Sequence, residues 1–232
     1  MTHLKDYFIK KIIIGVDHKP NFLHTEKARK SLNNFIEKYN HASVKKIGAE
    51  ESYEIKNEHE YWKFFAEWNH FGFEMENSLD FESAESTCKT FLSHYSNDIG
   101  ISIYSRVGIR VIFLFPFNGT FEELLKFYNN NMYKNVEIYN SFGDIDDAGI
   151  IVLTAHDKKY KMNLSFGPFA KGEIKSKISD FKNYDEKFDN SFMVDIDLFQ
   201  DKPQKYVLNT YISETLNAAR VKVLKFKSTL KE

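Results

Sequence analysis

Apolar and polar side chains alternate most clearly in the middle of the chain. Almost every second position from 101 to 117 is apolar. Because successive side chains of a strand point to opposite faces, this pattern predicts a strand over about 100–115 with the apolar set in the core. The opposite face carries Arg106, Gly108 and Arg110. The two arginines therefore point to the same side of the strand, ~13 Å apart along it.

Other segments are rich in β-branched and aromatic residues, which favour strands. The sequence predicts further strands at residues 7–16, 61–68, 71–77, 136–140, 150–155, 160–166 and 191–199. Short polar turns near Asn69–His70 and at residues 156–159 predict two β-hairpins. A helix over 60–69 is the alternative to the first hairpin arm. In the last strand Asp195 and Asp197 share one face, ~7 Å apart.

Apolar residues at helical spacing predict four helices. They are expected over residues 26–39, 82–96 and 120–132, and from Pro203 to near the C-terminus. Thr120 and Glu123 have the T-x-x-E spacing of a capping box. Thr25 and Ser83 are the candidate N-caps of the first two helices.

Strands that pair as hairpins and alternate with helices predict an α+β fold. We expect one twisted, largely antiparallel sheet covered by helices, with a long C-terminal helix. The length of 232 residues fits a single domain over residues 1–232. The sequence shows no flexible linker, low-complexity tract or internal repeat, and the turn at 117–120 is the candidate midpoint between two subdomains.

Two interpretations of the arginine-bearing strand remain open. If the strand at 191–199 is its neighbour, Arg106 and Arg110 can pair with Asp195 and Asp197 across the sheet. Alternatively, the guanidinium groups bind an acidic ligand, a phosphate or the carboxylate of a partner. Gly108 between them leaves backbone open to the approach of another chain, ring or ligand.

Charge and cysteine content exclude several classes of protein. The chain carries 32 Lys and Arg against 33 Asp and Glu, a net charge of −1, which argues against a general binder of nucleic acid or anionic membranes. The basic end of the C-terminal helix is the one local exception. The single cysteine, Cys88, excludes an intramolecular disulfide and any multi-cysteine metal site. Without a signal peptide or an apolar run of about 20 residues, we expect a soluble, cytoplasmic protein.

Motifs for catalysis are missing from the sequence. It contains no glycine-rich phosphate loop, no G-x-S-x-G elbow and no zinc-type histidine spacing. The loop GDIDDAG places Asp144, Asp146 and Asp147 together, and clustered carboxylates can hold Mg²⁺ or Ca²⁺. An acidic turn is the simpler interpretation, and no cofactor is expected. If Asp195 and Asp197 approached this loop, a metal-dependent hydrolase would become the alternative.

The hairpin at 61–77 is unusually rich in aromatic residues. Its rings include Tyr61, Trp62, Trp68 and Phe71. So many rings exceed what one side of a hairpin can bury, and exposed aromatics mark surfaces that contact other proteins. Packing beneath the covering helices is the alternative.

Two segments resemble a known family. The residues RVGIR (106–110) in an aromatic strand before a capped helix, and VDIDLF (194–199) before the terminal helix, resemble the motifs of a sporadically distributed bacterial family of uncharacterised proteins. The resemblance covers mainly residues 100–132 and 190–228. It implies a domain that travels with defence, toxin–immunity or prophage genes, and it transfers no catalytic residue.

The sequence therefore favours a non-enzymatic interaction or accessory subunit of a bacterial defence or toxin–immunity cassette. Its expected partner is another protein, contacted through the arginine strand and the aromatic hairpin. Two alternatives remain: a metal-dependent hydrolase acting on phosphoester or nucleotide substrates, and a small-ligand sensor with an aromatic-lined pocket.

Overall fold

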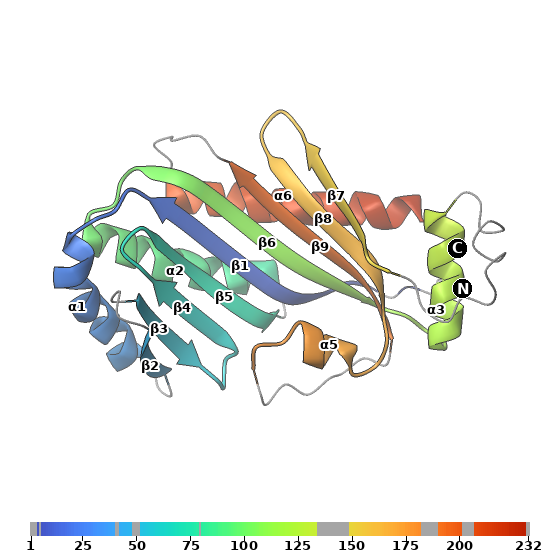
Figure 1. Cartoon of the computed structure of the whole chain (residues 1–232), viewed down its shortest axis with the longest axis horizontal. Helices are drawn as coiled ribbons and strands as arrows, with labels where there is room; N and C mark the ends of the chain where they lie inside the picture. The colour runs from blue at the N-terminus through green and yellow to red at the C-terminus, as the bar shows by residue number, and fades with distance from the viewer. Residues whose placement is uncertain are drawn as a thin grey trace.

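The architecture comes from a computed structural model of the chain (Figure 1). It describes residues 4, 6–39, 52–78, 80–133, 149–181, 190–200 and 207–230, together with the backbone of residues 42–47.

The strands form a single antiparallel sheet. Within the described residues its nine strands lie in the order β2-β3-β4-β5-β1-β6-β9-β8-β7. Their bounds are β1 (Phe8–His18), β2 (Ala42–Ile47), β3 (Ser52–Asn57), β4 (Trp62–Ala66), β5 (His70–Ser78), β6 (Tyr104–Pro116), β7 (Ile151–His156), β8 (Lys161–Phe169) and β9 (Ser191–Gln200). Both predicted hairpins are confirmed, β4–β5 and β7–β8, and the helical alternative for residues 60–69 is wrong. The predicted α+β class is confirmed.

Five helices accompany the described part of the sheet. They are α1 (Leu23–Lys38), α2 (Phe81–Ile99), α3 (Phe121–Met132), α5 (Glu173–Lys177) and α6 (Leu208–Thr229). The short helix α5 was not predicted. No described helix is long and apolar enough to cross a membrane.

Of the three N-caps that the sequence predicts, one is confirmed. The capping box of Thr120 and Glu123 is confirmed at α3. The other two caps are wrong, because both helices begin before the residues chosen from the pattern. Asp80 caps α2 by accepting a hydrogen bond from the Ser83 backbone N–H. Helix α1 begins at Leu23, so Thr25 lies inside its first turn. Pro203 and the predicted strand at 136–140 lie outside the described residues.

One face of the sheet is buried beneath helices. In Figure 1 α2 and α6 run behind the strands, and both contact the central part of the sheet. The apolar set predicted for β6 faces them, with Val107, Ile109 and Val111 fully buried. Cys88 of α2 is also part of this core. The alternation read from the sequence therefore assigned the core face of β6 correctly from Val107 onward. Before that point it was wrong, because Ile103 is 51% exposed and Tyr104 only 4%, where a register shift falls between Asp17 and His18 of β1.

The opposite side, here called the open face, is covered differently. Ile112 and Leu114 of β6 form a small cluster there with Met193 of β9 and Ile174 of α5. The helix α5 therefore covers one part of this face, and explains why the polar side of β6 ends in apolar residues. Arg106, on the same face, is exposed.

The order of elements repeats around the centre of the sheet. Each half has a central strand, a helix, a meander that returns toward the centre and a closing helix: β1, α1, β2–β5, α2, then β6, α3, β7–β9, α6. The sequence shows no such repeat. The turn at 117–120 lies inside the second half, between β6 and α3. Because β1 and β6 are neighbours, residues from both halves meet on the open face.

Candidate functional site

Arg110 is held by an ion pair across two strands. β6 and β9 are antiparallel neighbours, as one interpretation of the sequence required. The Arg110 Nη2 atom donates to Asp195 Oδ2 at 2.6 Å, and Nε donates to Oδ1 at 2.9 Å. The Asp195 side chain is only 8% exposed, whereas that of Arg110 is 48% exposed. The hydrogen bonds to Asp195 raise the pKa of Arg110. A buried carboxylate therefore holds an arginine whose outer part remains accessible.

Asp197 lies directly opposite Arg110 in the strand register. Its Oδ2 atom accepts a hydrogen bond from Asn163 Nδ2 at 3.2 Å. Burial raises the pKa of this carboxyl group, although Asn163 and both arginines oppose the effect. Asp195 and Asp197 thus have different roles: the first anchors Arg110, and the second faces the surface beside it.

Arg106 lies at the other end of the same face. Its guanidinium carbon is 4.5 Å from the centre of the Phe199 ring, a cation–π arrangement. Asp17 of β1 is directly opposite Arg106 and next to His70 of β5. The Nδ1 atom of His70 donates to Asp17 Oδ1, and this hydrogen bond lowers the pKa of Asp17. The His70 ring in turn stacks on Phe65, with ring centres 5.3 Å apart.

Three glycines lie side by side between these charged ends. Gly72, Gly15 and Gly108 are direct neighbours on β5, β1 and β6. A Cβ on Gly72 would lie 2.2 Å from the Phe65 ring and 2.4 Å from a backbone oxygen, so packing requires glycine there. Within the described part of the chain, a Cβ on Gly108 would come no closer than 3.4 Å to a neighbouring element, and Gly108 has no positive φ. Packing does not explain the absence of a side chain at Gly108.

These residues surround a depression, here called the open-face cleft. Its volume is about 240 Å³, and its lining is Ile13, Gly15, Asp17, Phe65, His70, Arg106, Gly108, Arg110 and Asp197. A second depression of about 250 Å³ lies beside it and shares Arg110 and Asp197. The open-face cleft offers hydrogen-bond donors and acceptors around bare backbone, which suits a flat group lying close to the sheet.

The aromatic residues singled out in the hairpin are dispersed. Trp62 is 1% exposed and Phe71 is fully buried, so both belong to the core and neither is available to a partner. Tyr61 packs edge-on against Phe181. Trp68 alone among the four is exposed, at 45%. The aromatic residue that reaches the open-face cleft is Phe65, on the strand face opposite Trp62; the two-residue alternation was the signal that could have identified it.

A second group of charges lies on the open face, here called the lysine–carboxylate network. It comprises Lys10, Lys11, Lys63, Glu74, Glu76 and Asp180. A register shift between Ile9 and Lys11 lets both adjacent lysines reach carboxylates, as β-bulges do. Lys10 Nζ lies 2.7 Å from Glu76 Oε2, and Lys11 Nζ lies 2.7 Å from Glu74 Oε1.

The three carboxylates of this network have the proximity of a metal site, with ligand oxygens within 4.8 Å of one another. Lysine ammonium groups already stand beside each of them. Lys11 Nζ is also 2.8 Å from Asp180 Oδ2, and Lys63 Nζ is 3.1 Å from the same atom. Burial raises the pKa of Glu74, against the lysine charges. The arrangement fits an ion-pair network rather than a cation site.

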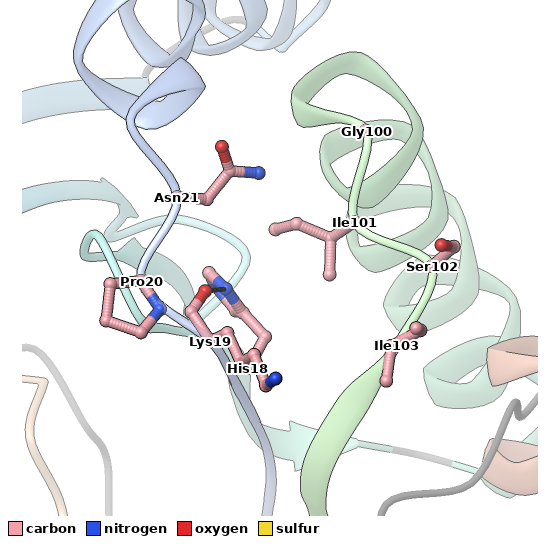
Figure 2. Close-up of a pocket in the computed structure, with 8 residues that line it drawn as sticks. All are labelled: His18, Lys19, Pro20, Asn21, Gly100, Ile101, Ser102 and Ile103. Carbon is pink, nitrogen blue, oxygen red and sulfur yellow. Dashed lines mark hydrogen bonds between the residues drawn. The ribbon is translucent and has the colours of Figure 1, made fainter.

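Another depression lies at the end of the sheet where β1 and β6 meet α1 and α2. Figure 2 shows Asn21 and Ile101 reaching toward each other from the two connections, around a volume of about 260 Å³. His18 lines it and donates through Nδ1 to the Lys19 carbonyl at 2.7 Å. Its Nε2 atom is buried and has no hydrogen-bond partner among the described residues. Burial lowers the pKa of His18.

The other candidate groups are the acidic loop, the basic end of the C-terminal helix and the single cysteine. Asp144, Asp146 and Asp147 lie outside the described residues. On the basic C-terminal helix Lys222 pairs with Asp157 at 2.8 Å and Lys227 with Asp6 at 3.3 Å, so acidic neighbours balance part of its charge. Burial raises the pKa of the Cys88 thiol, which is typical of an unreactive core cysteine.

Comparison of the chain with protein families, curated proteins and solved structures found no match.

Proposed function

We propose that this protein is a non-enzymatic binding protein that holds a small planar ligand in the open-face cleft. The observation that carries the proposal is Gly108. Glycine inside a strand costs roughly 0.5–1 kcal/mol of folding free energy relative to alanine. Neither its backbone conformation nor its neighbours require glycine at this position. Access to bare backbone is the remaining physical use of the residue.

The walls of the cleft support a planar occupant. Phe65 and His70 form a stacked pair on one side, and Arg106 lies over Phe199 near the other. Aromatic rings and guanidinium groups both offer flat faces to a conjugated ring. Arg110 and Asp17 add polar groups near the two ends of the floor. This is the combination of apolar faces and few polar groups expected of a small-molecule site.

The test uses a substitution that fills the cleft without removing any of its polar groups. Gly108→Val should leave the protein folded, because valine favours strands, and should abolish binding. Ligand-observed NMR with a library of planar aromatic compounds would compare wild type, Gly108→Val and a control, Gly149→Ala. A Cβ on Gly149 meets nothing within 4 Å among the residues that the structure describes. Compounds that bind wild type and the control but not Gly108→Val support the proposal; equal binding to all three contradicts it.

A second candidate function is an accessory subunit that contacts another protein, as the sequence favours. It is supported by exposed apolar side chains at one end of the molecule: Phe22 is 84% exposed, Trp68 45% and Ile103 51%. Trp68 and the start of α1 are adjacent, because the Asn21 backbone N–H donates to the Trp68 carbonyl at 3.0 Å. Clustered apolar exposure of this kind favours protein contact.

Affinity purification from the native host would test this second candidate. A stoichiometric partner retained by wild type and lost from the double variant Phe22→Ser/Trp68→Ser would support it. Recovery of a component of a defence or toxin–immunity cassette would also support the gene context that the resemblance implies. A partner retained equally by the double variant would exclude this end of the molecule as the interface.

A further inference from the structure

One edge of the Arg110 guanidinium group is hydrogen-bonded to Asp195, and the other edge is available to a ligand. Its hydrogen bonds within the described part of the chain go from Nε and Nη2 to Asp195. The Nη1 atom makes none there, and the side chain is 48% exposed at the cleft. A guanidinium group anchored on one edge offers donors of fixed direction on the other.

Asp197 has the complementary arrangement. Its hydrogen bond within the described residues is accepted by Oδ2 from Asn163. The Oδ1 atom lies 3.8 Å from the position that a Cβ on Gly108 would take, so it overhangs the floor of the cleft. Asp197 is directly opposite Arg110 on the neighbouring strand. An available donor and an available acceptor therefore stand side by side at one end of the cleft.

Charge limits what can occupy this position. The lining includes two arginines and two aspartates, and Asp195 already balances Arg110. A carboxylate or phosphate would gain Arg110 but would meet the charges of Asp197 and Asp17. A cation would meet Arg106 and Arg110. Because desolvating an unmatched charge is costly, the cleft favours a ligand without net charge at the bound edge.

We propose that the ligand is a planar nitrogen heterocycle, of the purine or pyrimidine type, whose edge carries an N–H donor beside an acceptor. The acceptor of the ring binds Arg110, and the N–H group donates to Asp197. The ring lies over Gly108 and beside the His70 ring, which covers Gly15 and stacks on Phe65. This inference rests on the function proposed above, since it names the chemistry of the ligand in the same cleft.

The opposite end of the cleft supports the same class. The Nδ1 atom of His70 donates to Asp17, which leaves Nε2 for a ligand. That atom lies 4.0 Å from the position of a Cβ on Gly15, and therefore beside the floor. A heterocycle with polar atoms on two edges can bond to Arg110 and Asp197 at one end and to His70 at the other.

Isothermal titration calorimetry with inosine, guanosine and uridine would test the inference. At least one should bind with a dissociation constant below about 1 mM. Inosine and 1-methylinosine provide the matched comparison, because methylation at N1 removes the only N–H donor of the base. We expect methylation to weaken the binding of inosine by about tenfold or more, as the loss of a hydrogen bond to a charged group does.

Variants separate recognition of the N–H group from simple steric exclusion. Asp197→Leu removes the acceptor, and should reduce the discrimination between inosine and 1-methylinosine to about twofold or less. Arg110→Lys keeps a positive charge for Asp195 but loses the planar guanidinium group. It should weaken the binding of inosine, while circular dichroism shows that the protein remains folded.

Several outcomes overturn the inference. They are no binding of any of the three nucleosides, equal binding of inosine and 1-methylinosine, or discrimination that is unchanged in Asp197→Leu. If other planar compounds bind wild type but not Gly108→Val, the proposed function stands and only the heterocycle is wrong. If no planar compound binds the cleft, both proposals fail.

Discussion

The open face carries two groups of paired opposite charges, which differ in how far they are buried and hydrogen-bonded. In the lysine–carboxylate network the side chains of Lys10 and Glu76 are both 0% exposed and lie 2.7 Å apart. At the open-face cleft Arg110 is 48% exposed, and its Nη1 atom is unused within the described residues. Both groups lie on the same sheet and combine lysine or arginine with aspartate or glutamate.

The content of charged residues therefore does not identify a binding site. Asp180, which follows α5, donates to Glu76 from its backbone and pairs with Lys11 through its side chain. The segment after α5 thereby completes the network and buries it. The cleft has polar groups that are positioned by neighbours, as Arg110 is by Asp195, but not saturated by them. Positioned and unsaturated groups are the ones that can recognise a ligand.

The largest expected effect comes from breaking the network. Glu76→Leu removes the carboxylate that accepts from Lys10, from Ser179 Oγ and from the Asp180 backbone. Loss of one partner of a buried ion pair costs about 3–5 kcal/mol, so the midpoint of urea unfolding should fall strongly. In the double variant Lys10→Met/Glu76→Leu most of the loss should be recovered. A single variant as stable as wild type would show that the pair does not hold this part of the fold.

The glycine row allows a direct comparison of structural and functional positions. Gly72→Ala should destabilise the protein by about 1–3 kcal/mol, the usual range for overpacking, because its Cβ would lie 2.4 Å from the Ile14 carbonyl oxygen. Gly108→Ala should be neutral or stabilising by up to about 1 kcal/mol. Urea unfolding of the two variants measures both. Equal destabilisation would contradict the claim that Gly108 is kept for access.

A smaller effect is expected where the cleft is anchored. Arg110→Met leaves the buried Asp195 without its cation and should cost about 1–2 kcal/mol, discounted because Arg110 is half exposed. Arg110→Lys should cost less, because an ammonium group can still approach Asp195. Thermal unfolding measures the order. If Arg110→Met were as stable as wild type, Asp195 would not be the group that positions Arg110.

The smallest effect concerns the pair of Asp17 and His70. The hydrogen bond from His70 holds the pKa of Asp17 below its ordinary value of 3.8. A lowered pKa in the folded state means that the pair stabilises the protein above that value and loses this contribution as the pH falls through the folded pKa. The gain is below about 1 kcal/mol, because the pair is partly exposed. The melting temperatures of wild type and Asp17→Asn should differ at pH 7 and converge only as the pH falls below the folded-state pKa of Asp17, which lies below 3.8; a constant difference would contradict the assignment.

Local features of the fold were predictable from the sequence. The capping box at Thr120, the β4–β5 hairpin and the core face of β6 all depend on residues a few positions apart. The caps of α1 and α2 were not. Asp80 rather than Ser83 caps α2, and α1 begins after Phe22, which makes no side-chain cap hydrogen bond, so a polar N-cap was the wrong signal there. The sequence left the burial of Trp62 and Phe71 open, with packing beneath the helices as the alternative to exposure, because the number of rings that α2 covers depends on how that helix packs against the sheet.

The same distinction between local and long-range features applies to the candidate site. The sequence alone determined that Arg106, Gly108 and Arg110 share the face opposite the core, because alternation along a strand is a consequence of backbone geometry. It also placed Asp195 and Asp197 on one side of their strand. The position of β1 between β5 and β6 became known from the folded sheet. It brings Gly15 beside Gly108 and His70 beside Asp17, 53 residues apart in the chain. Strand order is set by long-range packing and pairing, which no local pattern encodes.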